Sequence, residues 1–157
     1  MYQRILVPVD GSAPAQRALD EAIAVAKMTG ARIRVLHVVD EPFVALGVDA
    51  FSGSPGDLLE LMQEAARRTV AAATARVAAA GVACDGTIAD SLNGRVCDLV
   101  AEAARSWQAG LIVIGTHGRH GVARVVLGSD AEQILRVSPV PVLLVHAATP
   151  VEPAPGA

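Results

Sequence analysis

Short apolar runs alternate with longer amphipathic segments along most of the 157 residues, and this alternation limits the folds that the chain can adopt. The runs are rich in β-branched residues and bounded by turn residues, as buried strands are, and the segments between them repeat apolar residues at helical spacing. We expect strands over residues 4–9, 33–39, 82–89, 111–114 and 140–145. Strands that alternate with helices form βαβ units with right-handed crossovers. The sequence therefore predicts an α/β fold: a doubly wound, mostly parallel, five-stranded, Rossmann-like sheet with helices on both faces.

Start and stop signals bound the first helix. Ser12 is a candidate N-cap, Pro14 suits the first turn, and Gly30 follows the last residue of the apolar pattern. A hydroxyl side chain at the N-cap and a glycine after the last turn are the preferred helix ends. Further helices are expected over residues 58–77, 96–107 and 129–137.

Two stretches break the alternation. Residues 41–56 are rich in Pro, Gly and Ser and form a long connection for a compact domain, which is typical of a lid or a partner surface. Residues 148–157 are rich in Pro and Ala, and we expect a flexible C-terminal tail there. The predicted organisation is one domain over residues 1–147 followed by that tail.

Composition and charge exclude several classes of protein. A net charge of −3 without a basic stripe argues against a nucleic-acid binder, because phosphate contacts need clustered Lys and Arg. No apolar run reaches the length of a membrane span, and the N-terminus lacks the regions of a signal peptide. Cys84 and Cys97 show neither a disulfide framework nor metal-ligand spacing. We therefore expect a cytoplasmic protein with reduced thiols and no membrane or nucleic-acid partner.

Glycines are concentrated after the fourth predicted strand. Gly115 and Gly118 are separated by two residues, and nine residues lead from Gly118 to Gly128 and Ser129. Residues without a Cβ let backbone N–H groups converge on an anion, and the helix that follows adds free donors and a positive dipole end. In a doubly wound sheet, ligands bind beyond the carboxyl ends of the strands. The spacing therefore predicts a polyphosphate site in this loop.

This G-x2-G-x9-G-S spacing resembles the motif of the ATP-binding members of the universal stress protein family. The resemblance extends to RILVPVDGS at the first strand, LHVVDE at the second and SPVPVLLV at the last. It implies the doubly wound fold, a bound ATP whose phosphates carry Mg²⁺, and a homodimer formed through the strand from Val140 to Val145.

The resemblance also assigns roles to single residues. Asp10, at the end of the first strand, corresponds to the acid that contacts the nucleoside, and the backbone of Val38 corresponds to the position that pairs with the edge of adenine. The phosphate end corresponds to the loop and the helix start that follow the fourth strand. Its implied residues are Gly115, His117, Gly118, Gly128 and Ser129, and Asp130, which follows them directly, is a further candidate site residue.

Two positions depart from the family pattern. Asp130 would bring negative charge near the phosphates, and Ala131 has no hydroxyl to donate to them. Structural explanations also stand beside the functional ones: Ser129 and Glu132 match a capping box, Asp10 can cap a turn, and Gly128 can simply turn the chain.

The histidines have structural explanations as well. His117 and His120 lack a Cys, Asp or Glu at ligand spacing, so loop roles are favoured over a metal site, and His37 is expected to be a hydrogen-bonded histidine within the sheet.

Three functions remain open. The first is a nucleotide-responsive regulator with a protein partner that the sequence does not name, and the second is a nucleotide-free interaction protein of the same fold. The third is a slow ATPase; a fast enzyme is not expected, because the chain has no GxxxxGK[ST] loop and no evident base for the γ-phosphate.

Overall fold

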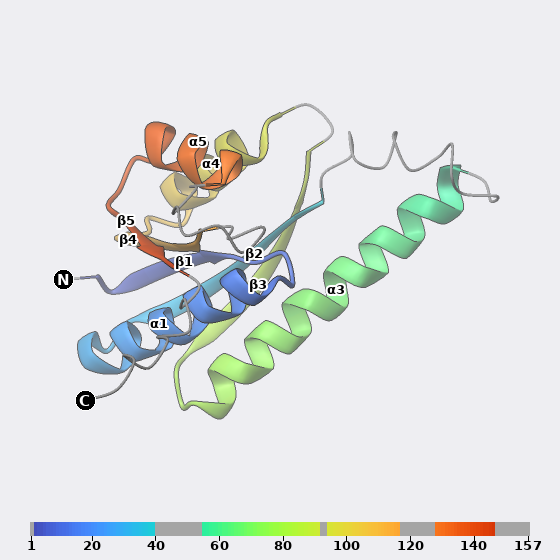
Figure 1. The fold of residues 1–157 in the computed structure, drawn as a ribbon. Helices are drawn as coiled ribbons and strands as arrows, with labels where there is room; N and C mark the ends of the chain where they lie inside the picture. Colours follow the sequence, from blue (N-terminus) through green and yellow to red (C-terminus); the bar gives the residue numbers. More distant parts are fainter. Residues whose placement is uncertain (1, 40–54, 92–93, 117–127, 147–157) are drawn as a thin grey trace, which may run out of the picture.

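The computed structural model describes residues 2–39, 55–91, 94–116 and 128–146 of the chain. These residues form one five-stranded sheet with the strand order β3-β2-β1-β4-β5, and every pair of neighbouring strands is parallel (Figure 1). The strands are β1 (Arg4–Pro8), β2 (Arg32–Val39), β3 (Cys84–Asp90), β4 (Leu111–Gly115) and β5 (Val142–Val145). The helices are α1 (Ala13–Thr29), α3 (Pro55–Ala79), α4 (Val96–Ser106) and α5 (Ser129–Val137). The predicted doubly wound α/β fold is confirmed.

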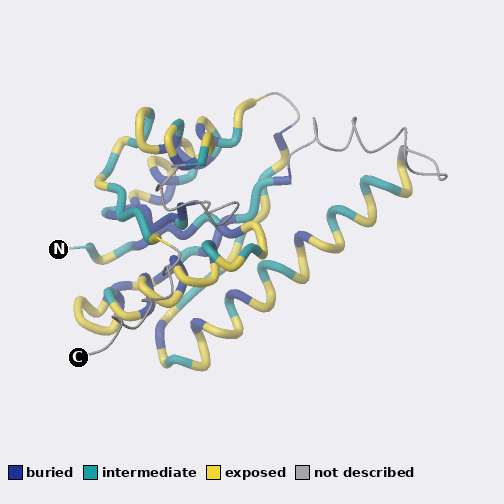
Figure 2. Tube along the Cα trace, in the orientation of Figure 1, coloured by how far each residue is buried: buried dark blue, intermediate teal, exposed yellow. Residues whose placement is uncertain are grey.

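Helices cover both faces of the sheet, with α1 and α3 on one side and α4 and α5 on the other (Figure 1). Alternate residues of β1 point to opposite faces, so Ile5 and Val7 pack with α1 and α3, whereas Leu6 packs with α4 and α5. All three side chains are fully buried. Figure 2 shows this burial along the central strands, which explains why their sequences are continuously apolar.

The caps predicted for α1 are confirmed. The Ser12 hydroxyl accepts a hydrogen bond from the Ala15 amide at 3.3 Å, and proline lies at the start of the helix. Gly30 ends α1 in the left-handed conformation with φ 69°, which favours glycine. These local signals fix both ends of the helix that leads away from β1.

Every strand differs from its expected range by one or two residues at one end or both. β1 ends at Pro8 and β3 begins at Cys84. β5 begins at Val142, not Val140, because the Val140 amide donates to the Ser138 hydroxyl and Pro141 has no N–H to donate. The loop predicted over residues 41–56 is wrong at its end, because residues 55 and 56 already belong to α3. Residues 41–54 and the predicted tail, residues 148–157, lie outside the described residues.

α3 is the longest helix, with 25 residues and a length of about 37 Å, and its first turns extend beyond the sheet (Figure 1). Its middle packs closely on β3, since a Cβ at Gly86 would lie 2.3 Å from Cγ1 of Val70. Across the described residues, no helix combines the length and apolar character needed to cross a bilayer.

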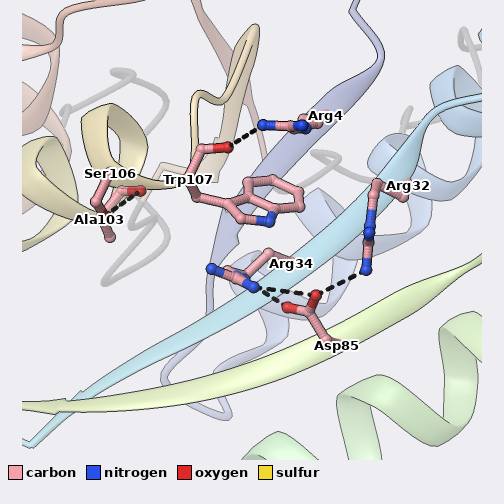
Figure 3. Close-up of polar contacts among 7 residues, drawn as sticks. All are labelled: Arg4, Arg32, Arg34, Asp85, Ala103, Ser106 and Trp107. Carbon is pink, nitrogen blue, oxygen red and sulfur yellow. Dashed lines mark hydrogen bonds and ion pairs between the residues drawn. The ribbon is translucent and has the colours of Figure 1, made fainter.

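A polar network ties together the amino-terminal ends of the strands (Figure 3). The Arg34 guanidinium lies 4.7 Å from the centroid of the Trp107 ring and pairs with Asp85, which also pairs with Arg32 at 3.0 Å. Arg4 donates to the Trp107 carbonyl at 2.9 Å. The hydrogen bond from Arg34 is the main reason that the pKa of Asp85 lies below its ordinary value, so this carboxylate is held in its charged form.

Candidate functional site

A pocket of about 190 Å³ lies at the carboxyl ends of the strands. It opens where the strand order reverses, because the chain runs from β1 outward to β2 and β3 on one side and to β4 and β5 on the other. Doubly wound sheets bind ligands at this position. Its lining residues come from six segments: Pro8, Val9, Asp10, Ser12, Ala15, Leu36, Val38, Val96, Gly115, Asp130, Ala131 and Ile134.

Asp10 borders this pocket and also shapes its wall. One carboxylate oxygen, Oδ1, accepts a hydrogen bond from the Ser12 amide at 2.9 Å, which forms a turn between β1 and α1. Gly11, inside that turn, has φ 79°. The structural role predicted for Asp10 is therefore confirmed, and the exposed carboxylate lies where a ligand in the pocket would meet it.

The backbone of Val38 faces the pocket beyond the last pair of β1. Pairing between the two strands ends at Pro8 and Leu36, and the Leu36 carbonyl accepts the Val9 amide at 2.8 Å. Successive residues of a strand direct their backbone groups to opposite neighbours, so Val38 faces the same side as Leu36. No described residue of β1 continues far enough to pair with it.

His37 bonds to the carbonyl that lies opposite the Val38 amide. Its Nδ1 lies 2.7 Å from the Val9 carbonyl, the acceptor that the Val38 amide would otherwise reach. Because a carbonyl can only accept, Nδ1 carries the hydrogen. The predicted hydrogen-bonded histidine is confirmed. Its effect on Val38 was not predicted, since it depends on where β1 ends.

Gly115 has a packing role that the sequence did not reveal. A Cβ at this residue would lie 2.4 Å from the carbonyl oxygen of Pro14, in the first turn of α1. Any larger residue would force α1 away from the end of β4. Gly115 also lines the pocket, so the close approach of backbone to backbone helps to set the width of the site.

The start of α5 forms the opposite wall. Asp130 and Ala131 line the pocket, and the first amide to bond within the helix is that of Glu132, which donates to the Gly128 carbonyl at 2.9 Å. The amides of the preceding first-turn residues have no acceptor inside the helix, and the positive end of the helix dipole lies beside the pocket.

The capping box predicted from Ser129 and Glu132 is wrong. Gly128 is the N-cap, with φ −61° and ψ 148° and no side-chain cap, and Ser129 is already the first helical residue. The Glu132 carboxylate accepts from Arg136 at 2.8 Å. The Glu132 carboxylate thus forms an i, i+4 ion pair along the helix.

The structure thus brings four of the predicted site residues to one pocket: Asp10, Val38, Gly115 and Asp130. Gly128 and Ser129 directly precede Asp130 but are not lining residues. His117 and Gly118, together with His120, lie outside the described residues. The apolar lining from Leu36, Val96 and Ile134 was not predicted as part of the site, because nothing in a helix or strand pattern separates a pocket wall from a core position.

Among the lining residues that the structure describes, the charged ones are Asp10 and Asp130. Among the described residues, no three His, Cys, Asp or Glu side chains come together as a metal cluster. Within the described part of the pocket wall, an anion near the start of α5 would meet backbone amides and the carboxylate of Asp130.

The family model described as the universal stress protein family matches residues 1–146. The chain belongs to the universal stress protein family. A universal stress protein of Methanocaldococcus jannaschii is 33% identical over 92% of the chain and 82% of its own length. The crystal structure of a universal stress protein family member from Burkholderia pseudomallei is 34% identical, with a TM-score of 0.74 over 93% of the chain and 97% of its own length.

Two further universal stress protein structures contain adenine nucleotides. One is a complex with cAMP, 24% identical with a TM-score of 0.65, over 94% of this chain and 98% of its own. The other, from Archaeoglobus fulgidus, is a complex with dAMP, 23% identical with a TM-score of 0.65, over 92% and 98%. At these identities the likeness establishes a shared fold.

Proposed function

We propose that this universal stress protein binds ATP in the pocket between β1 and β4 and acts as a nucleotide-responsive regulatory module, not as a fast enzyme. The observation that carries the proposal is the backbone edge of Val38, which faces the pocket where β1 has ended. A backbone N–H and C=O side by side offer one donor and one acceptor, and the edge of adenine presents the complementary pair.

The other walls of the pocket suit the rest of the nucleoside. Leu36 and Ile134 supply apolar surface for the base, and ligand pockets are mostly apolar with a few placed polar groups. The Asp10 carboxylate would accept hydrogen bonds from the ribose hydroxyls. The solved cAMP and dAMP complexes of the same fold support this choice of an adenine nucleotide.

The phosphates would lie at the start of α5, where first-turn amides and the helix dipole favour an anion. Mg²⁺ would be held mainly by the phosphates and water, and its charge would offset the nearby carboxylate of Asp130. With Asp130 in this position, the pocket would bind ATP with Mg²⁺ more tightly than metal-free ATP.

A nucleotide-free interaction protein is the second candidate, and the acidic residues in the pocket lining favour it. The two charged residues in the described part of the lining, Asp10 and Asp130, are both acidic, and Ala131 offers no hydroxyl. Without a cation, these features would weaken polyphosphate binding by Coulomb repulsion.

Calorimetry with matched nucleotides tests the adenine edge without altering the protein. We expect ATP with Mg²⁺ to bind roughly tenfold more tightly than ITP with Mg²⁺, because inosine reverses the donor and acceptor positions that face Val38. Equal binding of the two nucleotides would refute base recognition by this backbone. No heat with either at millimolar concentration would favour the nucleotide-free candidate, and sustained phosphate release would favour an enzyme.

A double-mutant cycle tests the ribose contact. Asp10→Asn keeps an oxygen that can accept from the Ser12 amide, so the turn is retained while the charge is lost. If Asp10 meets the ribose, this substitution weakens ATP binding but barely changes the binding of 2′,3′-dideoxy-ATP. Equal losses for both nucleotides would place the ribose elsewhere.

A homodimer through β5 is part of the same proposal. β5 is an edge strand, and edge strands expose backbone groups that pair with a second copy. The Val145 carbonyl faces β4, where it accepts the Thr116 amide, so Leu144 faces the open edge. Sedimentation velocity is expected to show a dimer for the natural chain and a monomer for Leu144→Pro.

A further inference from the structure

A second cavity lies behind the nucleotide pocket, on the opposite side of the segment that joins β1 to α1. It occupies about 340 Å³ between α1 and α3, and it shares Val9 and Ala15 with the first pocket. Its floor is apolar, formed by Val9, Leu19 and Ala73, which are at most 9% exposed. This volume is within the range of small-molecule sites.

Polar groups mark the two ends of this groove. At one end Gly11 and Thr69 lie close together, since a Cβ at Gly11 would be 3.8 Å from the Thr69 hydroxyl. At the other end Arg76 and Asp20 form an ion pair at 2.7 Å that joins α3 to α1. From residue 69 to residue 76 the groove runs about 10 Å along α3, as seven residues at the helical rise give.

Arg68 gives the groove its charge. It lines the cavity beside Thr69, and within the described part of the chain it forms no ion pair, whereas Arg76 is neutralised by Asp20. None of the described lining residues carries a carboxylate. One uncompensated guanidinium at the rim of an apolar groove complements an anion that carries an apolar chain.

We propose that this groove binds a small amphipathic carboxylate, with its head group at Arg68 and its unbranched apolar chain along Leu19 and Ala73. This inference goes beyond the proposed nucleotide function and does not depend on it, because the two cavities are lined mostly by different residues. Their only common wall is the segment that contains Val9 and Ala15.

Calorimetric titration with octanoate tests the chemistry of the ligand. We expect saturable binding in the millimolar range or below, weaker binding of octanol, and none of octylammonium. Methyl NMR places the ligand, with shifts at Leu19 and Ala73 and not at Ile134, which lines only the first pocket. No binding, equal binding of octylammonium, or shifts centred on Ile134 would overturn the proposal.

Two pairs of variants locate the head group and the chain. Arg68→Gln is expected to weaken octanoate roughly fivefold, whereas Arg67→Gln, whose side chain pairs with Glu64 outside the groove, leaves it unchanged. Ala72→Phe fills the groove from an exposed position and abolishes binding, whereas Ala71→Phe does not. Circular dichroism confirms the fold of each variant. Equal effects within either pair would overturn the assignment.

Discussion

The two ends of the sheet use their polar groups differently. At the amino-terminal end, Arg34 lies between the Trp107 ring and the Asp85 carboxylate, and charge is compensated within the fold. At the carboxyl-terminal end, the Val38 backbone faces a pocket instead of a partner strand. A sheet can thus fix its strands at one end and keep recognition groups available at the other. Substitutions at the first end should change stability, and those at the second should change binding.

Gly115→Ala should have the largest effect, because it lies at the binding end of the sheet and yet should change both stability and binding. The new Cβ would lie 2.4 Å from the Pro14 carbonyl, so α1 must move away from β4. We expect a loss of about 3 kcal/mol in the free energy of unfolding and loss of nucleotide binding, measured by urea unfolding and calorimetry. Gly128→Ala is the control, since φ −61° suits any residue, and should cost less than about 1 kcal/mol. A Gly115→Ala protein as stable as the natural one would contradict the close approach.

Asp85→Asn tests whether a substitution at the amino-terminal end of the sheet changes stability and leaves binding unchanged. Its carboxylate bridges Arg34 and Arg32, and we expect about 1 kcal/mol of lost stability at pH 7 with unchanged nucleotide affinity. The folded-state pKa of Asp85 is lowered, so its contribution is present above the ordinary value of 3.8 and is lost as pH falls through the folded-state value.

Urea unfolding at several pH values checks the sign of this effect. The difference between the natural chain and Asp85→Asn should shrink below pH 3.8. Asp98→Asn is a matched control: the pKa of Asp98 is also lowered, chiefly by the hydrogen bond from Arg95, but the pair is local and exposed. A difference that grows in acid would contradict the ion-pair explanation.

His37→Leu tests the recognition end through one hydrogen bond. Without Nδ1, the Val9 carbonyl is available to the Val38 amide, and the ladder can close over the adenine edge. We expect the ATP dissociation constant to rise about fivefold, while stability changes by no more than about 1 kcal/mol. His37→Gln retains a donor and should recover part of the affinity in the same calorimetric assay. Unchanged ATP affinity in His37→Leu would show that Val38 does not depend on this histidine.

Asp130→Asn should give the smallest effect, and in the direction of tighter binding. Removal of a negative charge beside the phosphates should improve ATP affinity about twofold at low salt, and the gain should disappear as salt screens the charge. Glu132→Gln is the control, because Glu132 pairs with Arg136 and does not line the pocket. A gain for Glu132→Gln equal to that for Asp130→Asn would indicate a general charge effect.

The fold was predictable because its signals are local. Apolar strands of β-branched residues, and caps such as Ser12 and Gly30, specify their elements without distant contacts. The predicted positions of Asp10, Val38, Gly115 and Asp130 also meet at one pocket, as the carboxyl ends of parallel strands must.

The remaining features depend on packing between segments far apart in the chain. The contact of Gly115 with Pro14 and the His37 bond to Val9 join different elements, and no sequence spacing encodes either. The capping box failed for a different reason: S-x-x-E also fits a helix that begins at Ser129, and the helix has Gly128 as its N-cap. The groove between α1 and α3 had no sequence signal, since several of its lining residues are also core positions of the same helices.

Trp107 is the only tryptophan of the chain, and it lies under Arg34 at the end of the sheet away from both cavities. The fluorescence emission of Trp107 will therefore change when that end of the sheet unfolds and will change little when a ligand binds in either cavity. A fluorescence titration would show no change in Trp107 emission even if the ligand bound tightly. The same isolation makes the indole a clean optical gauge of unfolding that bound nucleotide does not quench directly.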